Sequence, residues 1–219
     1  MKLERIAADD RPETVAAQLR ELIPHAQSVS ETVAEIIAQV RSYGDGAVHE
    51  YTRRFDMGGA EPPAPVIPSA ALDEAARGLA PDVRRGLERA IENVRRVAQA
   101  GLVDERAVEL EGHRILLRGA PVRRAGVYVP GGRAPYPSTV VMGVVTAQVA
   151  GVSDIVVCSP PDADGQLDPV LLAACQLTGA SSVLRIGGAH AVAALAYGTE
   201  TVVPVDVLVG PGNLYVQEA

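Results

Sequence analysis

The stretch GVYVPGG at residues 126–132 sets the fold class of this 219-residue chain. A short apolar run that leads at once into a glycine-rich turn is typical of a buried strand at the start of an α/β unit. Similar runs recur along the rest of the chain. The predicted strands are residues 126–129, 154–158, 182–186 and 205–209.

Segments with helical character separate these strands, and they are residues 138–150, 168–178 and 188–197. Ser138 and Asp168 stand where N-caps belong. Because no histidine partner for Ser138 can be identified, we interpret this serine as a helix cap and not as a nucleophile. Because the strands are apolar on both faces, the β-α-β-α-β-α-β order predicts an α/β fold with a parallel sheet and helices on its faces.

Glycine-rich turns follow three of the four predicted strands: Pro130-Gly131-Gly132, Gly187-Gly188 and Gly210-Pro211-Gly212-Asn213. In a parallel sheet these turns meet at one edge, where open α/β sheets bind ligands. Any α/β sheet can need glycine for tight turns at this edge, so one such turn would be weak evidence of a binding site. Three glycine-rich turns at the same edge favour a nucleotide site. Neither GxxxxGK[ST] nor a complete GxGxxG occurs, so such a site would be non-standard.

The front of the chain has the pattern of a helical segment without recognisable chemistry. The predicted helices are residues 12–23, 29–42, 47–55, 69–79 and 81–100, with a hairpin over 107–110 and 114–118. His25, His49 and His113 are isolated along this part of the chain. We therefore interpret these three histidines as structural or surface residues.

Composition excludes several classes of function. The net charge is −7, and there is one Phe, six Tyr and no Trp, so a nucleic-acid partner is not expected. The most apolar run, residues 139–152, is too short for a membrane span, and the start has no apolar signal-peptide core. We expect a cytoplasmic protein in which Cys158 and Cys175 are reduced core thiols.

A resemblance to the histidinol dehydrogenase family runs along essentially the whole chain. It rests on GVYVPGGRAPYPSTV (126–140), AQVAG (147–151), VCSPP (157–161), GGAHAVAALAYGTE (187–200) and VGPGN (209–213), with YGDGA (43–47) and YTRRFD (51–56) upstream. The resemblance implies a Rossmann-like parallel sheet of the aldehyde-dehydrogenase-like architecture. Residues 124–219 would form most of the NAD-binding domain, truncated at its end, and residues 1–123 a helical segment and part of an incomplete first domain.

The activity implied by the resemblance is the NAD-dependent, zinc-dependent oxidation of L-histidinol through L-histidinal to L-histidine, in a homodimer. The cofactor-binding residues that match the family pattern are Tyr128, Asn213 and His190. His190 stands where the family has a glutamine, and imidazole is shorter than that side chain and can titrate near neutral pH. The histidine in place of glutamine affects the expected strength or geometry of the contact with NAD. It does not weaken the resemblance to the family.

The family's zinc ligands and its catalytic Glu-His pair are expected beyond Ala219, so no catalytic or metal residue is assigned here. We therefore expect the 219-residue chain to be inactive by itself. Two alternatives stay open at this stage. One is a related NAD-dependent dehydrogenase of another small alcohol, such as a sulfonated diol, and the other is a truncated nucleotide-binding or assembly protein.

Overall fold

The computed structural model describes residues 11–21, 26–131 and 134–219. His25 and Gly132, both singled out in the sequence, lie outside these ranges. Within them, no helix is both long and apolar enough to cross a bilayer.

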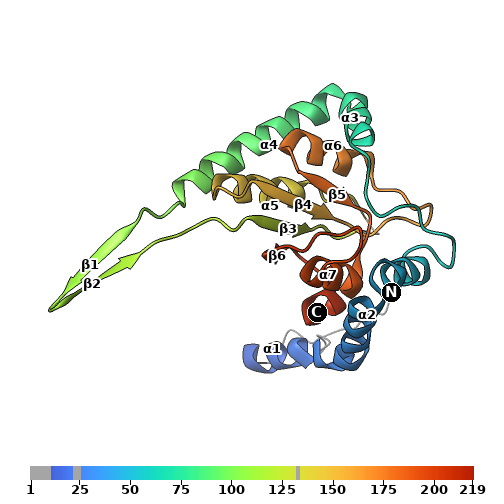
Figure 1. Ribbon diagram of the computed structural model, residues 1–219, viewed down its shortest axis with the longest axis horizontal. Helices are drawn as coiled ribbons and strands as arrows, with labels where there is room; N and C mark the ends of the chain where they lie inside the picture. The colour runs from blue at the N-terminus through green and yellow to red at the C-terminus, as the bar shows by residue number, and fades with distance from the viewer. Residues whose placement is uncertain (1–10, 22–25, 132–133) are drawn as a thin grey trace.

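The centre of the molecule is a parallel sheet in the order β5-β4-β3-β6 (Figure 1). Its strands are β3 (Arg124–Tyr128), β4 (Asp154–Cys158), β5 (Ser182–Leu184) and β6 (Val207–Val209). The predicted α/β fold with a parallel sheet is confirmed. β5 ends two residues before the predicted end, and β6 begins two residues after the predicted start.

Helices cover both faces of the sheet, as Figure 1 shows. On one face lie α3 (Ser69–Gly78), α4 (Pro81–Ala100), α5 (Pro137–Val149) and α6 (Pro169–Thr178). On the other lie α2 (Ser30–Phe55), α7 (Gly188–Tyr197) and α8 (Leu214–Glu218).

β4 shows why its sequence is apolar throughout. Ile155 and Val157 enter the core beneath α3 to α6, whereas Val156 and Cys158 enter the core beneath α2 and α7. Since successive side chains of a strand point to opposite faces, a strand covered on both sides has no polar face.

β6 departs from this pattern. It forms one edge of the sheet, and Val207 and Val209 are 40% and 48% exposed. The prediction that all four strands are buried on both faces is wrong for β6, because among the described residues only β3 pairs with it.

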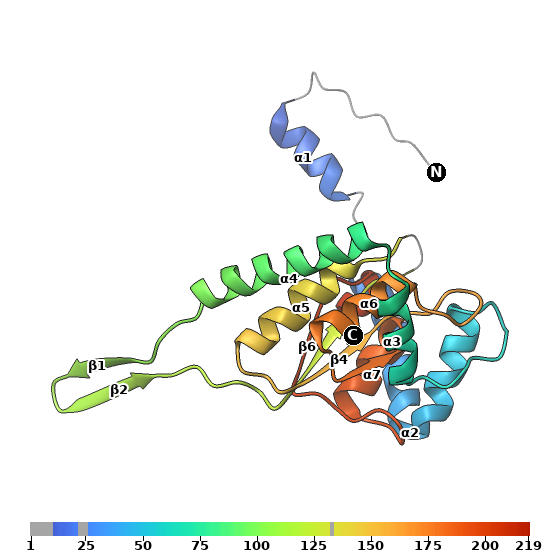
Figure 2. The same cartoon turned by 90° about the horizontal axis from the view of Figure 1, so that it is seen from above.

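The front helices pack directly on the sheet unit. α2 is one long helix with a non-helical residue at Gly44, where a break was predicted. The Asp45 carboxylate beside this kink accepts hydrogen bonds from the hydroxyls of Thr199 and Thr201, which follow α7. α1 (Pro12–Glu21) lies apart from the body (Figure 2), and the short 3₁₀ helix η1 (Ala26–Val29) leads into α2.

Two helix starts test the predicted N-caps. The Asp168 carboxylate accepts a hydrogen bond from the Val170 N–H at 2.7 Å, so the cap of α6 is confirmed. Ser138 is not a cap, because α5 begins at Pro137 and Tyr136 takes the N-cap position. Proline at the first helical position has no N–H to satisfy, so the helix starts there.

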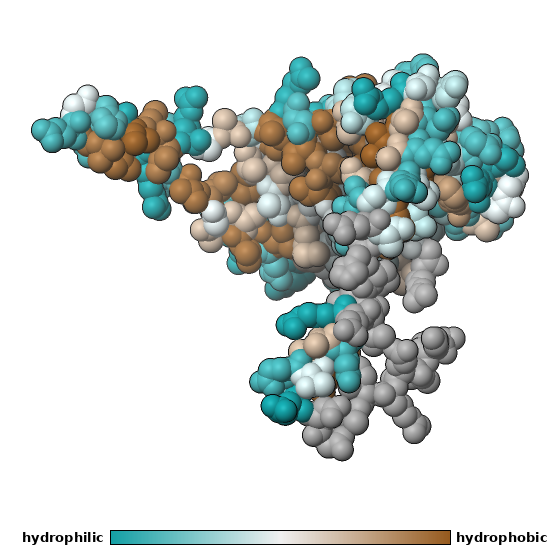
Figure 3. All heavy atoms as spheres, turned by 90° about the horizontal axis from the view of Figure 1, so that it is seen from below, coloured by the Kyte–Doolittle hydropathy of each residue, from teal (hydrophilic) through white to brown (hydrophobic). Residues whose placement is uncertain are grey.

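The hairpin of β1 (Arg106–Leu110) and β2 (His113–Leu117) projects far from the body (Figure 2). Its register puts one apolar group of side chains on a single face, and all of them are exposed: Val108, Leu110, Ile115 and Leu117. Figure 3 shows this apolar surface along the hairpin. A two-stranded hairpin is marginal alone in water, so this face is suited to contact with further protein surface.

Close packing of α5 on β3 gives a testable prediction. A Cβ added at Gly143 would lie 2.5 Å from Val127 Cγ1, whereas a Cβ added at Gly86 of α4 meets nothing within 4 Å. Both glycines are helical. We expect Gly143→Ala to lower the free energy of unfolding by about 1–3 kcal/mol, because overpacking outweighs helix propensity.

Gly86→Ala is the matched control, and helix propensity alone should raise its stability by up to about 1 kcal/mol. Urea denaturation of both variants measures the difference. Equal stabilisation by both substitutions would contradict the close approach of α5 to β3.

Candidate functional site

A cavity of about 610 Å³ opens at the carboxyl edge of the sheet, between α2 and the starts of α7 and α8. Its size is in the range of small-molecule sites. The residues that line it are Thr32, Glu35, Ile36, Tyr51, Arg54, Phe55, Asp56, Tyr128, Pro160, Gly188, Ala189, His190, Asn213 and Tyr215. The three predicted cofactor-binding residues, Tyr128, His190 and Asn213, are all among them.

Tyr128 is the last residue of β3, and its side chain is buried. Its hydroxyl oxygen accepts a hydrogen bond from the Gly188 N–H at 3.0 Å. Burial raises the pKa of Tyr128 to about 12. The phenol therefore keeps its proton at neutral pH and can donate it to a group in the cavity.

Gly188 makes this contact possible because it has a φ of +61°, in the left-handed region that side chains disfavour. It is the first residue of α7, and a Cβ there would also lie 3.2 Å from His190 Nδ1. Glycine thus lets the backbone turn tightly between the Tyr128 hydroxyl and the His190 ring. The positive end of the α7 dipole also lies at the cavity.

His190 lies one turn into α7 and is almost completely buried. The Thr52 hydroxyl donates to the Val48 carbonyl at 2.9 Å, so its oxygen is the acceptor for His190 Nε2 at 3.3 Å. This geometry puts the ring proton on Nε2. Nδ1 is then a buried acceptor, and it has no hydrogen-bond partner among the described residues.

Burial also lowers the pKa of His190 to about 3. The expectation that this imidazole titrates near neutral pH is therefore wrong, because desolvation disfavours its charged form. A neutral imidazole has one donor and one acceptor. It therefore carries donor and acceptor atoms, as the amide of glutamine does.

Asn213 stands at the N-cap of α8. Its Oδ1 accepts hydrogen bonds from the Tyr215 and Val216 N–H groups at 3.0 and 3.1 Å. These bonds fix the orientation of the amide. Its Nδ2 donors are thereby left for a group in the cavity.

α2 and the residue after it add side chains to the cavity that belong to the YTRRFD motif (51–56) but received no role in a site from the sequence. Tyr51 and Phe55 stack with ring centroids 5.5 Å apart, and both rings also lie near the His190 ring. Asp56 follows directly after α2, and its side-chain Oδ2 is buried and accepts no hydrogen bond from the residues that the structure describes. Only the tertiary packing of α2 on α7 brings these residues to the sheet edge.

A second cavity, of about 900 Å³, lies on the other face of the sheet edge. α3, α4, α6 and the turns after β3 and β4 line it, and it shares Pro160 with the first cavity. Although it is larger, it contains none of Tyr128, His190 and Asn213. The smaller cavity is therefore the candidate site.

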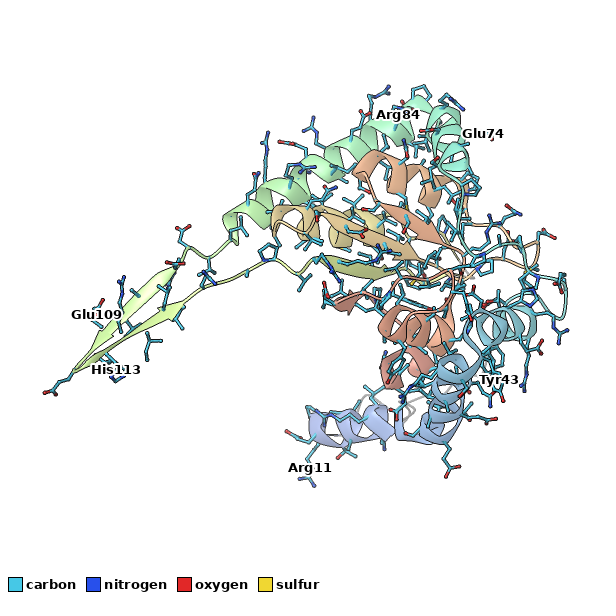
Figure 4. All side chains as sticks on the ribbon, in the orientation of Figure 1. Arg11, Tyr43, Glu74, Arg84, Glu109 and His113 are labelled. Carbon is cyan, nitrogen blue, oxygen red and sulfur yellow. The ribbon has the colours of Figure 1, made fainter. Side chains whose placement is uncertain are left out.

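The other histidines lie elsewhere. His49 pairs with Glu61 at 3.0 Å on the exposed side of α2. His113 lies near the tip of the hairpin, at the opposite end of the molecule from Tyr43 of α2 (Figure 4). The prediction that Cys158 and Cys175 are buried, unbridged thiols is confirmed, and burial raises the pKa of each to about 12.

The two implied cofactors fit the described residues differently. The first cavity has unpaired polar atoms and a close backbone approach, which suit a nucleotide. For zinc, the parts of the chain that the structure describes contain no cluster of three or more His, Cys, Asp or Glu side chains. We therefore assign no zinc ligand in this chain.

Comparison with known proteins identifies the family. The family profile described as histidinol dehydrogenase matches residues 21–219. This chain belongs to the histidinol dehydrogenase family. The structure is also similar to the crystal structure of histidinol dehydrogenase from Elizabethkingia anophelis, with a TM-score of 0.81 and 28% identity. That match covers 91% of this chain and 47% of the other.

Curated histidinol dehydrogenases match over most of the chain. The enzyme of Parasynechococcus marenigrum (strain WH8102) is 44% identical over 206 residues, which cover 91% of this chain and 47% of that protein. The enzyme of Xanthomonas euvesicatoria pv. vesicatoria (strain 85-10) is 41% identical over 217 residues, which cover 98% and 48%. The chain thus spans about half the length of the curated relatives that it matches.

Burial of His190 has a consequence for stability. With a folded pKa of about 3 and an unfolded pKa near 6.5, its contribution is complete above pH 6.5 and is lost as the pH falls towards 3. Between pH 7 and 5 we expect a loss of about 2 kcal/mol from this residue. His190→Gln has no imidazole to protonate and avoids that loss. Between pH 7 and 5 the free energy of unfolding of the variant should therefore rise by about 2 kcal/mol relative to that of wild type.

Urea denaturation at pH 7, 6 and 5 measures this difference. Asp56 acts in the opposite direction, because burial raises its pKa to about 6 and its contribution is lost as the pH rises. It is present in both proteins and cancels in the comparison. His113→Gln, on the exposed hairpin, should follow wild type at every pH. Parallel curves for His190→Gln and wild type would refute the buried, neutral state of His190.

Proposed function

We propose that this chain supplies the NAD site of an enzyme that oxidises L-histidinol through L-histidinal to L-histidine. Membership of the histidinol dehydrogenase family supports an oxidoreductase of histidine biosynthesis. The observation that carries the proposal is the convergence of Tyr128, His190 and Asn213 from three separate segments on one cavity. NAD bound in this cavity would supply the hydride acceptor for each of the two oxidation steps.

The hydrogen-bonding groups of the three residues support a dinucleotide as the ligand. Tyr128 has a phenol proton and Asn213 an amide Nδ2 to donate, and the His190 ring, with its acceptor Nδ1, lies in the wall of the cavity. Each orientation is fixed by a second contact within the protein: with Gly188, with the start of α8, and with Thr52. Groups fixed in advance lose little entropy when the ligand binds.

The neutral state of His190 supports the same assignment. The resemblance implies a glutamine at this position, and a titrating imidazole would have brought a positive charge into the cavity below neutral pH. With its pKa lowered to about 3, His190 offers only neutral donor and acceptor atoms. We infer that it takes over the role of the family's glutamine.

We place neither the zinc ligands nor the acid–base residues among the residues of this chain. The resemblance implies that zinc holds the substrate, and we assign its ligands to the part of the family's length that this chain does not span. We accordingly expect no NADH from L-histidinol and NAD with the purified 219-residue chain. Absorbance at 340 nm above a no-enzyme control would contradict that expectation.

We also propose that the whole protein is a homodimer, as the resemblance implies. The exposed apolar face of the β1–β2 hairpin supports an assembly, because side chains of this kind are normally covered.

Titration of NAD against the 219-residue chain tests the cofactor site. Wild type should bind saturably, and Asn213→Asp should weaken binding by about tenfold or more. The carboxylate still caps α8 but lacks the Nδ2 donor and repels the pyrophosphate. Isothermal titration calorimetry measures both affinities.

Asn93→Asp is the matched control, since Asn93 is exposed on α4 and the change in charge is the same. It should bind NAD like wild type. Failure of wild type to saturate into the millimolar range would refute the NAD site as a whole. Equal affinities for Asn213→Asp and wild type would remove Asn213 from it.

A further inference from the structure

Asp56 is a carboxylate of the candidate cavity with a buried oxygen atom that has no hydrogen-bond partner among the described residues. It follows the last turn of α2, where its N–H donates to the Thr52 carbonyl at 3.0 Å. Its side chain is 16% exposed to solvent and lines the cavity beside Tyr128 and His190. Oδ2 is buried and accepts no hydrogen bond from any described residue.

His190 does not satisfy this carboxylate. Its Nε2 lies 3.8 Å from Asp56 Oδ2, beyond hydrogen-bond distance. The Nε2 proton is instead directed to the Thr52 hydroxyl oxygen, which lies closer at 3.3 Å. Because His190 is neutral, it also provides no positive charge to balance Asp56.

Other charged or titratable side chains line the cavity from each surrounding element. Glu35, Tyr51 and Arg54 come from α2, Tyr128 from β3, His190 from α7 and Tyr215 from α8. Arg54 lies over the Phe55 ring at 5.2 Å and forms no ion pair with Asp56 within the described residues. Burial alone raises the pKa of Asp56 to about 6.

An ionised carboxylate in this position needs a hydrogen-bond donor, and the described residues do not provide one for Oδ2. Carboxylates at nucleotide sites of α/β folds accept hydrogen bonds from ribose hydroxyls. We propose that Asp56 accepts a hydrogen bond from a ribose hydroxyl of the bound dinucleotide. This inference rests on the proposed NAD site, and it adds a ligand-binding residue from the helical front of the chain.

Asp56→Asn tests the inference because it keeps the shape of the side chain and removes its charge. We expect NAD affinity to fall roughly ten- to a hundredfold at pH 7, the usual effect of losing a hydrogen bond to a charged group. The variant should be at least as stable as wild type in thermal unfolding, because it removes a buried, unpaired charge. Weaker binding with undiminished stability distinguishes a binding role from a structural one.

The pH dependence of binding gives a second readout. A hydroxyl donates to the ionised carboxylate, so NAD affinity of wild type should fall about tenfold between pH 7 and pH 5. Asp56→Asn should show no such fall. Glu50→Gln, which removes an exposed carboxylate of α2 outside the cavity, should reproduce both the affinity and the pH profile of wild type.

Two NAD analogues show which donor contacts Asp56. The 3-acetylpyridine analogue lacks the carboxamide NH₂, and nicotinamide hypoxanthine dinucleotide lacks the adenine NH₂, but both keep the two riboses. The effect of Asp56→Asn should persist with each. Disappearance of the effect with either analogue would assign the donor to the NH₂ group that this analogue lacks and would overturn the ribose contact.

The outcomes separate this inference from the NAD site itself. Saturable binding by wild type with unchanged affinity and pH profile in Asp56→Asn would overturn the role of Asp56 alone. Absence of saturable NAD binding by wild type would overturn the proposed site and this inference together.

Discussion

The hydrogen bond between the Gly188 N–H and the Tyr128 hydroxyl joins the end of β3 to the first turn of α7. It requires the left-handed backbone of Gly188, and the turn it closes brings His190 down beside α2. The cavity exists because this turn and the start of α8 leave the same sheet edge on the side that α2 covers. The rest of the site is arranged around that contact.

The front helices are therefore part of the site. α2 packs on α7 through one apolar core, and Thr52 orients the imidazole of His190. The kink at Gly44 is held by contacts of Asp45 with the segment after α7. A nucleotide-type sheet unit without α2 would lack one wall of the cavity and the partner that fixes the tautomer of His190.

Much of this arrangement could be predicted from the sequence. Strands such as β4 are apolar on both faces, so their type and the parallel order follow from the pattern. Parallel strands end at one edge of the sheet, so residues at or after the ends of separate strands could be expected close together there. These residues are Tyr128, His190 and Asn213. The family resemblance added their roles, which residue patterns alone did not provide.

Other features depend on tertiary structure that no local pattern encodes. Asp56 follows a helix far from the sheet in sequence, and its unpaired state arises only when α2 packs on α7. β6 resembles the inner strands in sequence, but its position at the sheet edge leaves it exposed. The pKa of His190 likewise depends on burial, which sequence does not show.

The most direct test of this account is a crystal structure of the 219-residue chain soaked with NAD. We expect difference density for the dinucleotide in the cavity between α2, the end of β3 and the starts of α7 and α8, in contact with Tyr128, His190 and Asn213. Density in the larger cavity beneath α3, α4 and α6 instead, with the predicted cavity empty, would contradict it.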